Sequence, residues 1–238
     1  MTMNRRDFLR MSAALTAAGM SPSLFAATKE QFTIYGAPAM PSVTIAVAAA
    51  QGKLAKQADV ALEIWRSPDQ LRAGVASGQF KVMMSPSNVG VNLRNQGQQV
   101  GMVNILTNGI TQLMCKSGAI TSPQELVGKK ILVPFKNDMP DIVLQALLKK
   151  LNIDINKVDI TYAATPTEAI GLFLLKDFHA AILPEPMASA VVQKAKIVGT
   201  EIVRGFDLVK EWGQAFNTKP LIPMAGIIAN EEYFHAHK

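Results

Sequence analysis

The stretch KILVPFKNDMPDIVLQALLKKL, residues 130–151, decides the fold class because it joins a buried strand to a helix through a short loop. Residues 130–134 are mostly apolar and end at a proline, which predicts a strand. From Met139 onward, apolar residues stand at 142, 143, 144, 147, 148 and 151, the spacing of a helix with one buried face. A strand followed in this way by a helix is the repeating unit of parallel sheets.

The same alternation of strands and helices extends along the chain on both sides of this stretch. The sequence predicts further strands at residues 31–35, 59–65, 80–84, 99–107, 111–116, 158–162, 178–183 and 224–229, and further helices at 43–50, 67–77, 88–95, 122–126, 165–175 and 186–194. Ser67 followed by Pro68 is a typical helix start, with the serine as N-cap. Two successive series of this size favour an α/β protein with two lobes, each a parallel sheet covered by helices on both faces.

The expected lobe boundaries follow from the order of these segments. Residues 27–107 are assigned to the first lobe and residues 108–200 to the second, and residues 201–238 are expected to return to the first lobe. No Gly/Ser-rich linker separates the two series, so the hinge is expected at a short double crossover near residues 107–109 and 199–205.

The N-terminus has the three parts of an export signal. Arg5-Arg6 supplies the basic start, Met11 to Met20 is a mildly apolar run, and the segment Leu24 to Ala27 offers small residues for a peptidase. The apolar run is about half of the roughly 20 residues needed to span a bilayer. Since the arginine pair resembles the twin-arginine signal, residues 1–26 are expected to direct export to the periplasm and then to be removed. An ordinary amphipathic N-terminal helix is the alternative.

Charge and composition exclude several functional classes. Removing residues 1–26 takes away three arginines and one aspartate, which lowers the formal net charge from +6 to +4. The remaining lysines and arginines are scattered, whereas nucleic-acid binding needs a concentrated basic stripe, so no nucleic-acid partner is expected.

Cys115 lies among apolar residues and is interpreted as a buried small hydrophobe. His235 and His237 supply only two metal ligands, and no nucleophile elbow or phosphate-binding loop is present, so the sequence predicts no metal, no cofactor and no catalysis.

Three segments of the second series, taken in their order along the chain, resemble a known family. Leu126 to Pro134, Asn137 to Asp141 and Ile182 to Pro186 are similar to the second lobe of the periplasmic substrate-binding proteins of nitrate/sulfonate/taurine-type ABC importers. Relatives of that family also bind thiamine pyrimidine precursors. The resemblance covers most of the chain after residue 26. It implies a type II periplasmic-binding fold, in which a small-molecule ligand lies in a cleft between the lobes and is delivered to an ABC transporter permease; we expect a monomer.

The chain departs from the family pattern in two places. Asp177 and His179 replace the usual glycine and aspartate just before the strand that leads to Glu185. Family members usually continue for several dozen helical residues after a segment like residues 229–237. We therefore expect the C-terminus to be either naturally short or truncated.

Ligands of open α/β sheets bind outside the carboxyl ends of the strands, where loops lead into helix N-termini. From these loops we expect ligand contacts by Gly36, Pro38, Met40, Ser42, Ser85, Ser87, Asn88, Thr107, Asn108, Phe135, Lys136, Asn137, Asp138, Asp141 and Glu185. Unpaired backbone N–H groups and the helix dipole favour an anion there, and Lys136 is the one cation of these loops.

Several of these residues have an ordinary structural use as well. Ser87 and Asn88 are typical helix caps, and Asp138 with Asp141 fits an N-cap and N3 pair. For Asp138, capping is favoured over ligand contact. Glu185 can stabilise the dipole of its own helix. If the three carboxylates all faced the cleft, Coulomb repulsion would disfavour a simple anion and favour an amine or a zwitterion.

The sequence therefore predicts a non-catalytic solute-binding protein that captures a small polar organic molecule by lobe closure. The candidate ligands are a sulfonate, an amine or zwitterion, and a pyrimidine-like compound. Two alternatives stay open. An enzyme of the pyrimidine-synthesising kind on the same fold would need Cys115 and His179 to converge on the cleft. A periplasmic sensory subunit would present ligand occupancy to a membrane receptor in place of an importer.

Overall fold

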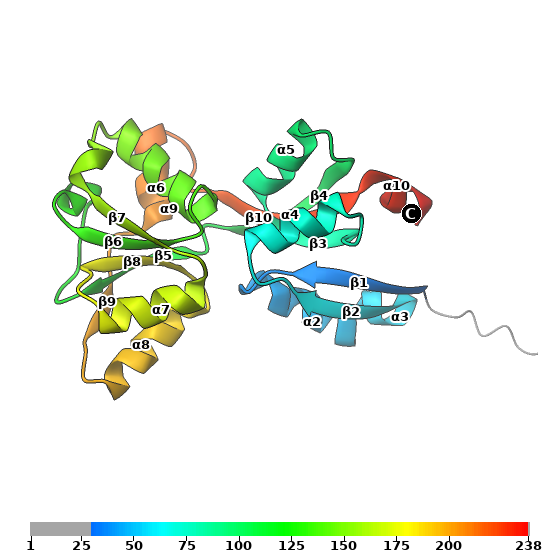
Figure 1. Ribbon diagram of the computed structural model, residues 1–238, viewed down its shortest axis with the longest axis horizontal. Helices are drawn as coiled ribbons and strands as arrows, with labels where there is room; N and C mark the ends of the chain where they lie inside the picture. The colour runs from blue at the N-terminus through cyan, green and yellow to red at the C-terminus, as the bar shows by residue number, and fades with distance from the viewer. Residues whose placement is uncertain (1–29, 238) are drawn as a thin grey trace, which may run out of the picture.

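The computed structural model describes residues 30–237 and divides them between two lobes, each built on one five-stranded sheet (Figure 1). The strand order is β2-β1-β3-β10-β4 in the first sheet and β7-β6-β8-β5-β9 in the second. The α/β class and the two lobes expected from the sequence are therefore confirmed. The N-terminal segment that carries the predicted export signal lies outside the described residues.

The first lobe contains both ends of the described chain. Its elements are β1 (Glu30–Gly36), α2 (Pro41–Gln51), α3 (Lys53–Gln57), β2 (Ala58–Ile64), α4 (Pro68–Ala76), β3 (Val82–Pro86), α5 (Ser87–Asn95), β4 (Val100–Asn108), β10 (Pro223–Asn230) and α10 (Glu231–Ala236). The predicted cap of α4 is confirmed, because the Ser67 side chain accepts a hydrogen bond from the backbone N–H of Gln70. The short helices α3 and α10 were not predicted from the sequence.

The second lobe is one continuous segment of the chain. Its elements are β5 (Thr111–Lys116), the 3-10 turn Pro123–Leu126, β6 (Lys130–Pro134), α6 (Met139–Lys150), the 3-10 turn Ile155–Lys157, β7 (Asp159–Ala163), α7 (Pro166–Leu175), β8 (Ala180–Pro184), α8 (Met187–Ile197), β9 (Ile202–Arg204) and α9 (Leu208–Phe216). β8 occupies the centre of the sheet, and all five of its residues are buried. Apolar clusters on the two faces of this sheet involve α6 on one side and α7 with α8 on the other.

The prediction of two wholly parallel sheets is wrong, because each sheet contains a strand that runs the other way. β10 is antiparallel to both of its neighbours, β3 and β4. β5 is likewise antiparallel to β8 and β9. The reason is the double crossover. β5 enters the second lobe from the waist and β10 returns to the first lobe from the waist, whereas the other strands end there, so β5 and β10 run in the opposite direction.

The return to the first lobe comes later than residue 200. β9 pairs with β5 at the edge of the second sheet. The loop and helix that follow it place Phe206 and Leu208 in the second lobe's core. The second crossover therefore lies between α9 and β10 rather than at residues 199–205. It runs beside the first one, since the Gly109 backbone N–H donates to the Ile222 carbonyl at 2.9 Å.

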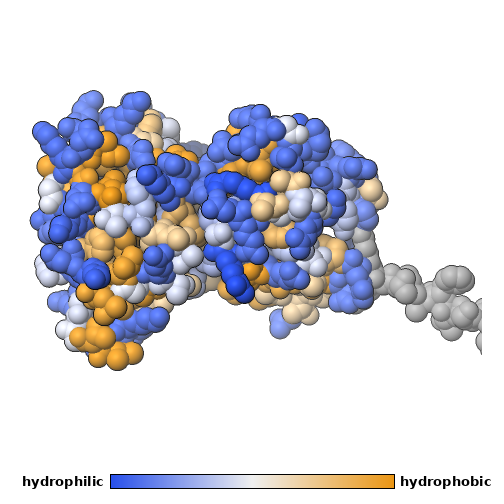
Figure 2. Space-filling view, in the orientation of Figure 1, coloured by the Kyte–Doolittle hydropathy of each residue, from blue (hydrophilic) through white to orange (hydrophobic). Residues whose placement is uncertain are grey.

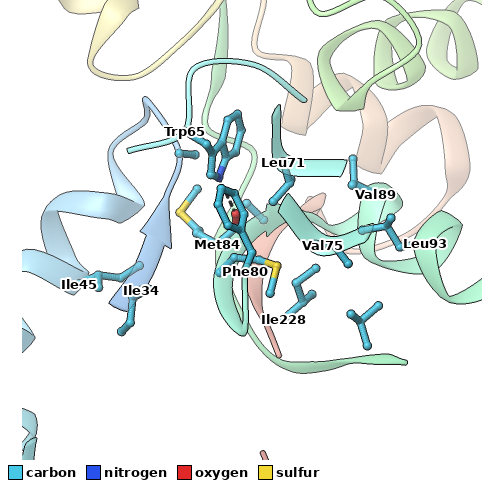
Figure 3. Packing of buried hydrophobic residues seen from close by; sticks show 14 residues of the cluster. Ile34, Ile45, Trp65, Leu71, Val75, Phe80, Met84, Val89, Leu93 and Ile228 are labelled. Atoms are coloured by element: carbon cyan, nitrogen blue, oxygen red, sulfur yellow. Dashed lines mark hydrogen bonds between the residues drawn. The ribbon is translucent and has the colours of Figure 1, made fainter. Parts of the chain in front are cut away.

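The core of the first lobe includes an indole ring that follows β2. Trp65 is 2% exposed, and its Nε1–H donates to the Met84 carbonyl at 3.0 Å (Figure 3). Leu71 from α4 and Phe80, which precedes β3, complete the packing near this ring. The loop after β2 is thus anchored to the end of β3, and this fixes one wall of the space between the lobes.

No described helix has both the length and the apolar character needed to cross a membrane.

A matched pair of glycine substitutions tests the sheet assignment of β10. In Gly226→Ala the new Cβ would lie 1.9 Å from the backbone oxygen of Asn104 in the neighbouring strand β4. We expect the free energy of unfolding of the first lobe to fall by about 2 kcal/mol or more, since backbone cannot yield as a side chain does. Gly171→Ala, on an exposed face of α7, meets no atom within 4 Å and should stabilise its lobe by about 0.5–1 kcal/mol.

Urea unfolding followed by tryptophan fluorescence measures the Gly226→Ala effect in a Trp212→Phe background, where Trp65 of the first lobe is the remaining tryptophan. Unfolding followed by circular dichroism measures Gly171→Ala. An unchanged midpoint for Gly226→Ala would contradict the pairing of β10 with β4.

Candidate functional site

The carboxyl ends of strands from both sheets face each other across the waist of the molecule, where the two bodies meet in the space-filling view (Figure 2). A narrow cavity of about 60 Å³ lies there. It is lined by Ala37, Pro38, Ala39, Trp65, Met84, Pro86, Met224 and Ala225 of the first lobe, by Ile110 and Thr111 at the crossover, and by Phe135, Met139, Pro140, Pro166 and Pro184 of the second. We call this space the interlobe cavity. Nearly all of its walls are apolar side chains.

A second hollow adjoins the interlobe cavity through Phe135, which lines both. It is larger, about 290 Å³, and its lining includes Arg72 from α4 together with Lys136, Asp138 and Tyr162 of the second lobe. The Lys136 ammonium lies 5.1 Å from the centre of the Tyr162 ring, a cation–π contact. An apolar cavity therefore borders a charged hollow, and both are bounded by the two lobes.

Two of the predicted site residues line the interlobe cavity directly, namely Pro38 and Phe135. Most of the predicted short polar side chains are instead engaged by nearby backbone. The Ser42 hydroxyl donates to the Ala37 carbonyl at 2.6 Å, and buried Ser85 donates to the Pro86 carbonyl at 3.0 Å. These hydroxyls therefore shape the loops of the first lobe.

Three further predicted residues lie at the crossover or beside it. The Ser87 hydroxyl donates to the carbonyl of Pro223 at 2.7 Å, so it does not cap α5 as the sequence suggested. Thr107 donates to the Ala225 carbonyl at 3.5 Å, and Asn108 pairs with Pro223 in the sheet. All three connect β10 to its surroundings.

The loop of residues 36–42, which follows β1, is tightly packed and contacts the second lobe. Gly36 leaves no room for a side chain, because a Cβ there would lie 2.6 Å from the Ser42 hydroxyl. Farther along the same loop, the backbone N–H of Met40 donates to the carbonyl of Glu185 at 3.0 Å. This hydrogen bond joins the two lobes on one side of the interlobe cavity.

The carboxylate of Glu185 is held within its own lobe. It accepts a hydrogen bond from the backbone N–H of Ser189 at 3.1 Å, which is the helix-stabilising role left open by the sequence. It also forms an ion pair with Arg204 of β9, a partner that sequence reasoning missed. With its carboxylate engaged in this way, Glu185 presents its backbone carbonyl to the first lobe.

Asp138 occupies the N-cap position of α6, as the sequence suggested, but its side chain makes no capping hydrogen bond. Its side chain instead crosses to the first lobe, where it accepts hydrogen bonds at 3.1 Å from Arg72 Nη2 and at 3.1 Å from Asn88 Nδ2. Burial raises the pKa of the Asp138 carboxyl, and this effect outweighs the opposing contributions of Asn88 and Arg72; the charge of nearby Asp69 raises it further. Arg72 was not predicted, because only the docking of the lobes brings it to the waist.

Asp141 supports the loop that carries these residues. It is fully buried and accepts hydrogen bonds from the Asn137 backbone N–H at 2.8 Å, from Gln145 at 2.8 Å and from the Tyr162 hydroxyl at 3.0 Å. Burial, followed by the hydrogen bond to the Asp141 carboxylate and its charge, raises the pKa of Tyr162. Phe135 and Asn137 adopt left-handed backbone angles, with φ of 60° and 62°, which for a phenylalanine is strained. The loop is therefore held in an unusual shape by a buried carboxylate.

The residues required by the enzymatic alternative lie away from the interlobe cavity. Cys115 is fully buried in the second lobe's core, and burial raises the pKa of its thiol. His179 Nδ1 accepts a hydrogen bond from the backbone N–H of Lys130 at 3.0 Å. Neither side chain lines the interlobe cavity, and the described residues contain no group of three or more potential metal ligands.

Comparison with protein families gives a match over most of the chain. The model of the family described as NMT1/THI5 like matches residues 40–222, which include every loop of the interlobe cavity except residues 37–39 and 224–225. The chain belongs to this NMT1/THI5-like family. A search of curated proteins finds no relative with significant sequence similarity.

A second family match concerns the N-terminus of this NMT1/THI5-like protein. Residues 2–22 match the twin-arginine translocation pathway signal sequence. The exported, periplasmic location expected from the arginine pair is therefore confirmed, although the structure of this segment lies outside the described residues.

Solved structures with the same fold include several transport proteins. An ABC transporter from Parabacteroides distasonis is 18% identical, with a TM-score of 0.67 over 87% of this chain and 70% of that one. The periplasmic aliphatic sulphonate binding protein SsuA from Escherichia coli is 15% identical, with a TM-score of 0.66 over 88% and 68%. The alkanesulfonate-binding protein SsuA from Xanthomonas axonopodis bound to MOPS is 14% identical, with a TM-score of 0.61 over 89% and 69%. These likenesses establish the periplasmic-binding-protein fold of the NMT1/THI5-like chain.

Substitution of Asp141 tests the support of the Phe135–Asp138 loop. Asp141→Ala removes the acceptor of three hydrogen bonds from a buried position and leaves donors without a partner. We expect the free energy of unfolding of the second lobe to fall by about 2–4 kcal/mol. Tyr162→Phe, which removes one of the three bonds at a partly exposed ring, should cost about 1 kcal/mol. Differential scanning calorimetry of both variants measures the difference, and equal costs would show that Asp141 does not organise the loop.

Proposed function

We propose that this protein is the non-catalytic solute-binding component of an ABC importer, which closes its two lobes around a small organic molecule in the periplasm. The observation that carries the proposal is the interlobe cavity, whose lining comes from both lobes and from the crossover between them. A ligand that contacts both lobes favours the closed arrangement, because only differential contacts shift such an equilibrium. Closure would give the permease a shape to recognise, and the permease is the partner that we propose.

The chemistry of the walls supports an organic ligand over a small inorganic anion. Trp65 and Phe135 stand among proline and methionine side chains, and they would bind an apolar or ring-shaped part by burial and stacking. The adjoining hollow offers Arg72, Lys136 and Asp138 to a polar group. A sulfonate, a zwitterion or a pyrimidine-like molecule with a slim apolar part fits both spaces, whereas nitrate would leave the apolar walls unused.

The alternatives have less support. An enzyme of the pyrimidine-synthesising kind would need a nucleophile and a base at the ligand, yet Cys115 and His179 serve the core and the sheet of the second lobe. A sensory subunit would use the same cavity and differ only in its membrane partner. Neighbouring genes for a permease and an ATPase would favour import.

Ligand-dependent stabilisation tests the proposal. Small molecules released from natively purified protein are identified by mass spectrometry, and a panel of MOPS, shorter alkanesulfonates, zwitterionic amines, aminopyrimidines and nitrate is screened by thermal shift. We expect at least one organic compound to raise the melting temperature without being consumed, and nitrate to have no effect. Failure of every compound, with nothing released from the native protein, would contradict the proposed function. Turnover of a bound compound would replace it with the enzymatic alternative.

An aromatic pair of variants places the ligand in the interlobe cavity. Phe135→Ala removes a ring from the wall shared by the cavity and the hollow, and we expect affinity for the identified ligand to fall about tenfold or more. Phe234→Ala changes a partly exposed ring on α10, remote from the waist, and should leave affinity unchanged. Isothermal titration calorimetry measures both, and equal affinities for the two variants would place the ligand elsewhere.

A further inference from the structure

Three polar residues connect the lobes beside the interlobe cavity. Arg72 comes from α4 and Asn88 from α5, both in the first lobe, while Asp138 precedes α6 in the second. Arg72 Nη2 and Asn88 Nδ2 each lie 3.1 Å from a different oxygen of the Asp138 carboxylate. We call this set the interlobe bridge. Together with the Met40–Glu185 backbone hydrogen bond, the interlobe bridge makes a second polar contact between the lobes.

The two charges of the interlobe bridge differ in their access to water. The Asp138 side chain is 2% exposed, whereas that of Arg72 is 39% exposed and also pairs with Asp69 of its own helix. An arginine without Asp138 would remain hydrated, but a carboxylate without Arg72 would be a buried, poorly compensated charge. Removing either partner should therefore have unequal consequences.

Asn88 adds a second cost to the closed arrangement. Because an ionised carboxylate only accepts hydrogen bonds, the amide must turn its NH2 group toward Asp138. Its Oδ1 is then buried and finds no hydrogen-bond partner among the described residues. Separation of the lobes would return both Asn88 Oδ1 and the Asp138 carboxylate to water. The closed arrangement is thus held by Arg72 and opposed by the desolvation of two acceptors.

We propose that the interlobe bridge sets the equilibrium between open and closed lobes, with Arg72 as the residue that permits closure and ionised Asp138 as the group that opposes it. This inference deepens the proposed function, on which it rests, by assigning the regulation of the same cavity. Arg72, Asn88 and Asp138 are positioning residues in this role. A consequence is that acid favours closure.

The direction of the pH dependence follows from the surroundings of Asp138. Burial raises its pKa above the ordinary value despite Arg72 and Asn88, and Asp69 on α4 adds to the rise; Lys136 and Tyr162 border the same hollow. When the lobes separate, the carboxyl becomes hydrated and its pKa returns toward the ordinary value. Closure therefore binds protons. Closure is favoured most at a pH below the pKa that the Asp138 carboxyl has in the open state. This stabilisation of the closed lobes is lost as the pH rises through the pKa that the carboxyl has in the closed state.

The distance between two spin labels measures closure without any ligand, so the result does not depend on finding one. Labels are attached at Val47→Cys on α2 and Leu175→Cys on α7, both exposed, while native Cys115 is fully buried. Double electron–electron resonance gives the populations of short and long distances. We expect the short-distance population to grow as the pH falls from about 8 to about 4.5, a range above the ordinary carboxyl pKa.

Four variants distinguish the proposal from a simple loss of contact. Arg72→Met should reduce the closed population about fivefold or more, whereas Asp138→Asn should preserve or increase it and abolish its pH dependence. The double variant should recover most of the closed population lost in Arg72→Met. Arg94→Met is the matched control, because Arg94 pairs with Glu231 inside the first lobe. It should leave the distances unchanged.

Two outcomes would overturn the proposal. One is an opening of the lobes by Asp138→Asn as large as that caused by Arg72→Met. The other is a wild-type distance distribution that does not respond to pH. Circular dichroism melts of each variant verify that it is folded. If the protein shows the expected distances but binds no compound, the inference about the interlobe bridge stands and the proposed function is contradicted.

Discussion

The structure depends on the paired crossovers at the waist, because they carry the chain from one sheet to the other and back. Their backbones are joined by the hydrogen bond from Gly109 to Ile222. Gly109 has a positive φ of 59°, and a side chain there would lie 2.0 Å from Val209 of α9. Glycine is therefore required for both conformation and space. An apolar cluster of Met139, Val143, Ile222 and Met224 packs around this point, so the strand ends of the two lobes are brought face to face.

This constraint explains the unusual composition of the candidate site. The short polar residues that follow the strands hold their own loops, as the Ser42 and Ser85 hydroxyls do. The space between the lobes is left to prolines, methionines and two aromatic rings. Charge appears only beside that space, where Asp138 crosses to Arg72. An apolar cavity with a charged border suits an organic solute. The charged group that is desolvated on closure, Asp138, lies beside the apolar walls and not among them.

The sequence predicted local structure well and the docking of the lobes poorly. Strand and helix segments follow from apolar periodicity, and the Ser67 cap follows from a preference confined to four residues. The direction of β10 and the lobe of β9 depend on where the crossovers fall, which no local pattern specifies. Asp138 has the sequence of an N-cap, yet a cation from the other lobe competes for its carboxylate.

The predicted site residues likewise show that local patterns are predictable from the sequence and the docking of the lobes is not. The loops gather at the waist as the strand-end rule required, and Pro38 and Phe135 line the cavity. Trp65 and Arg72 were missed because they belong to the loop and the helix after β2, and they carry no motif. Their positions become visible only when the second lobe is placed against the first. The ligand contacts of the whole set remain predictions.

A crystal structure of the natively purified protein, with any co-purified molecule retained, would show whether a ligand lies in the interlobe cavity. We expect density for a small molecule between the lobes, in contact with Trp65 of the first lobe and Phe135 of the second. Density for a ligand on the outer face of a single lobe, with the interlobe cavity filled only by protein side chains, would contradict this expectation.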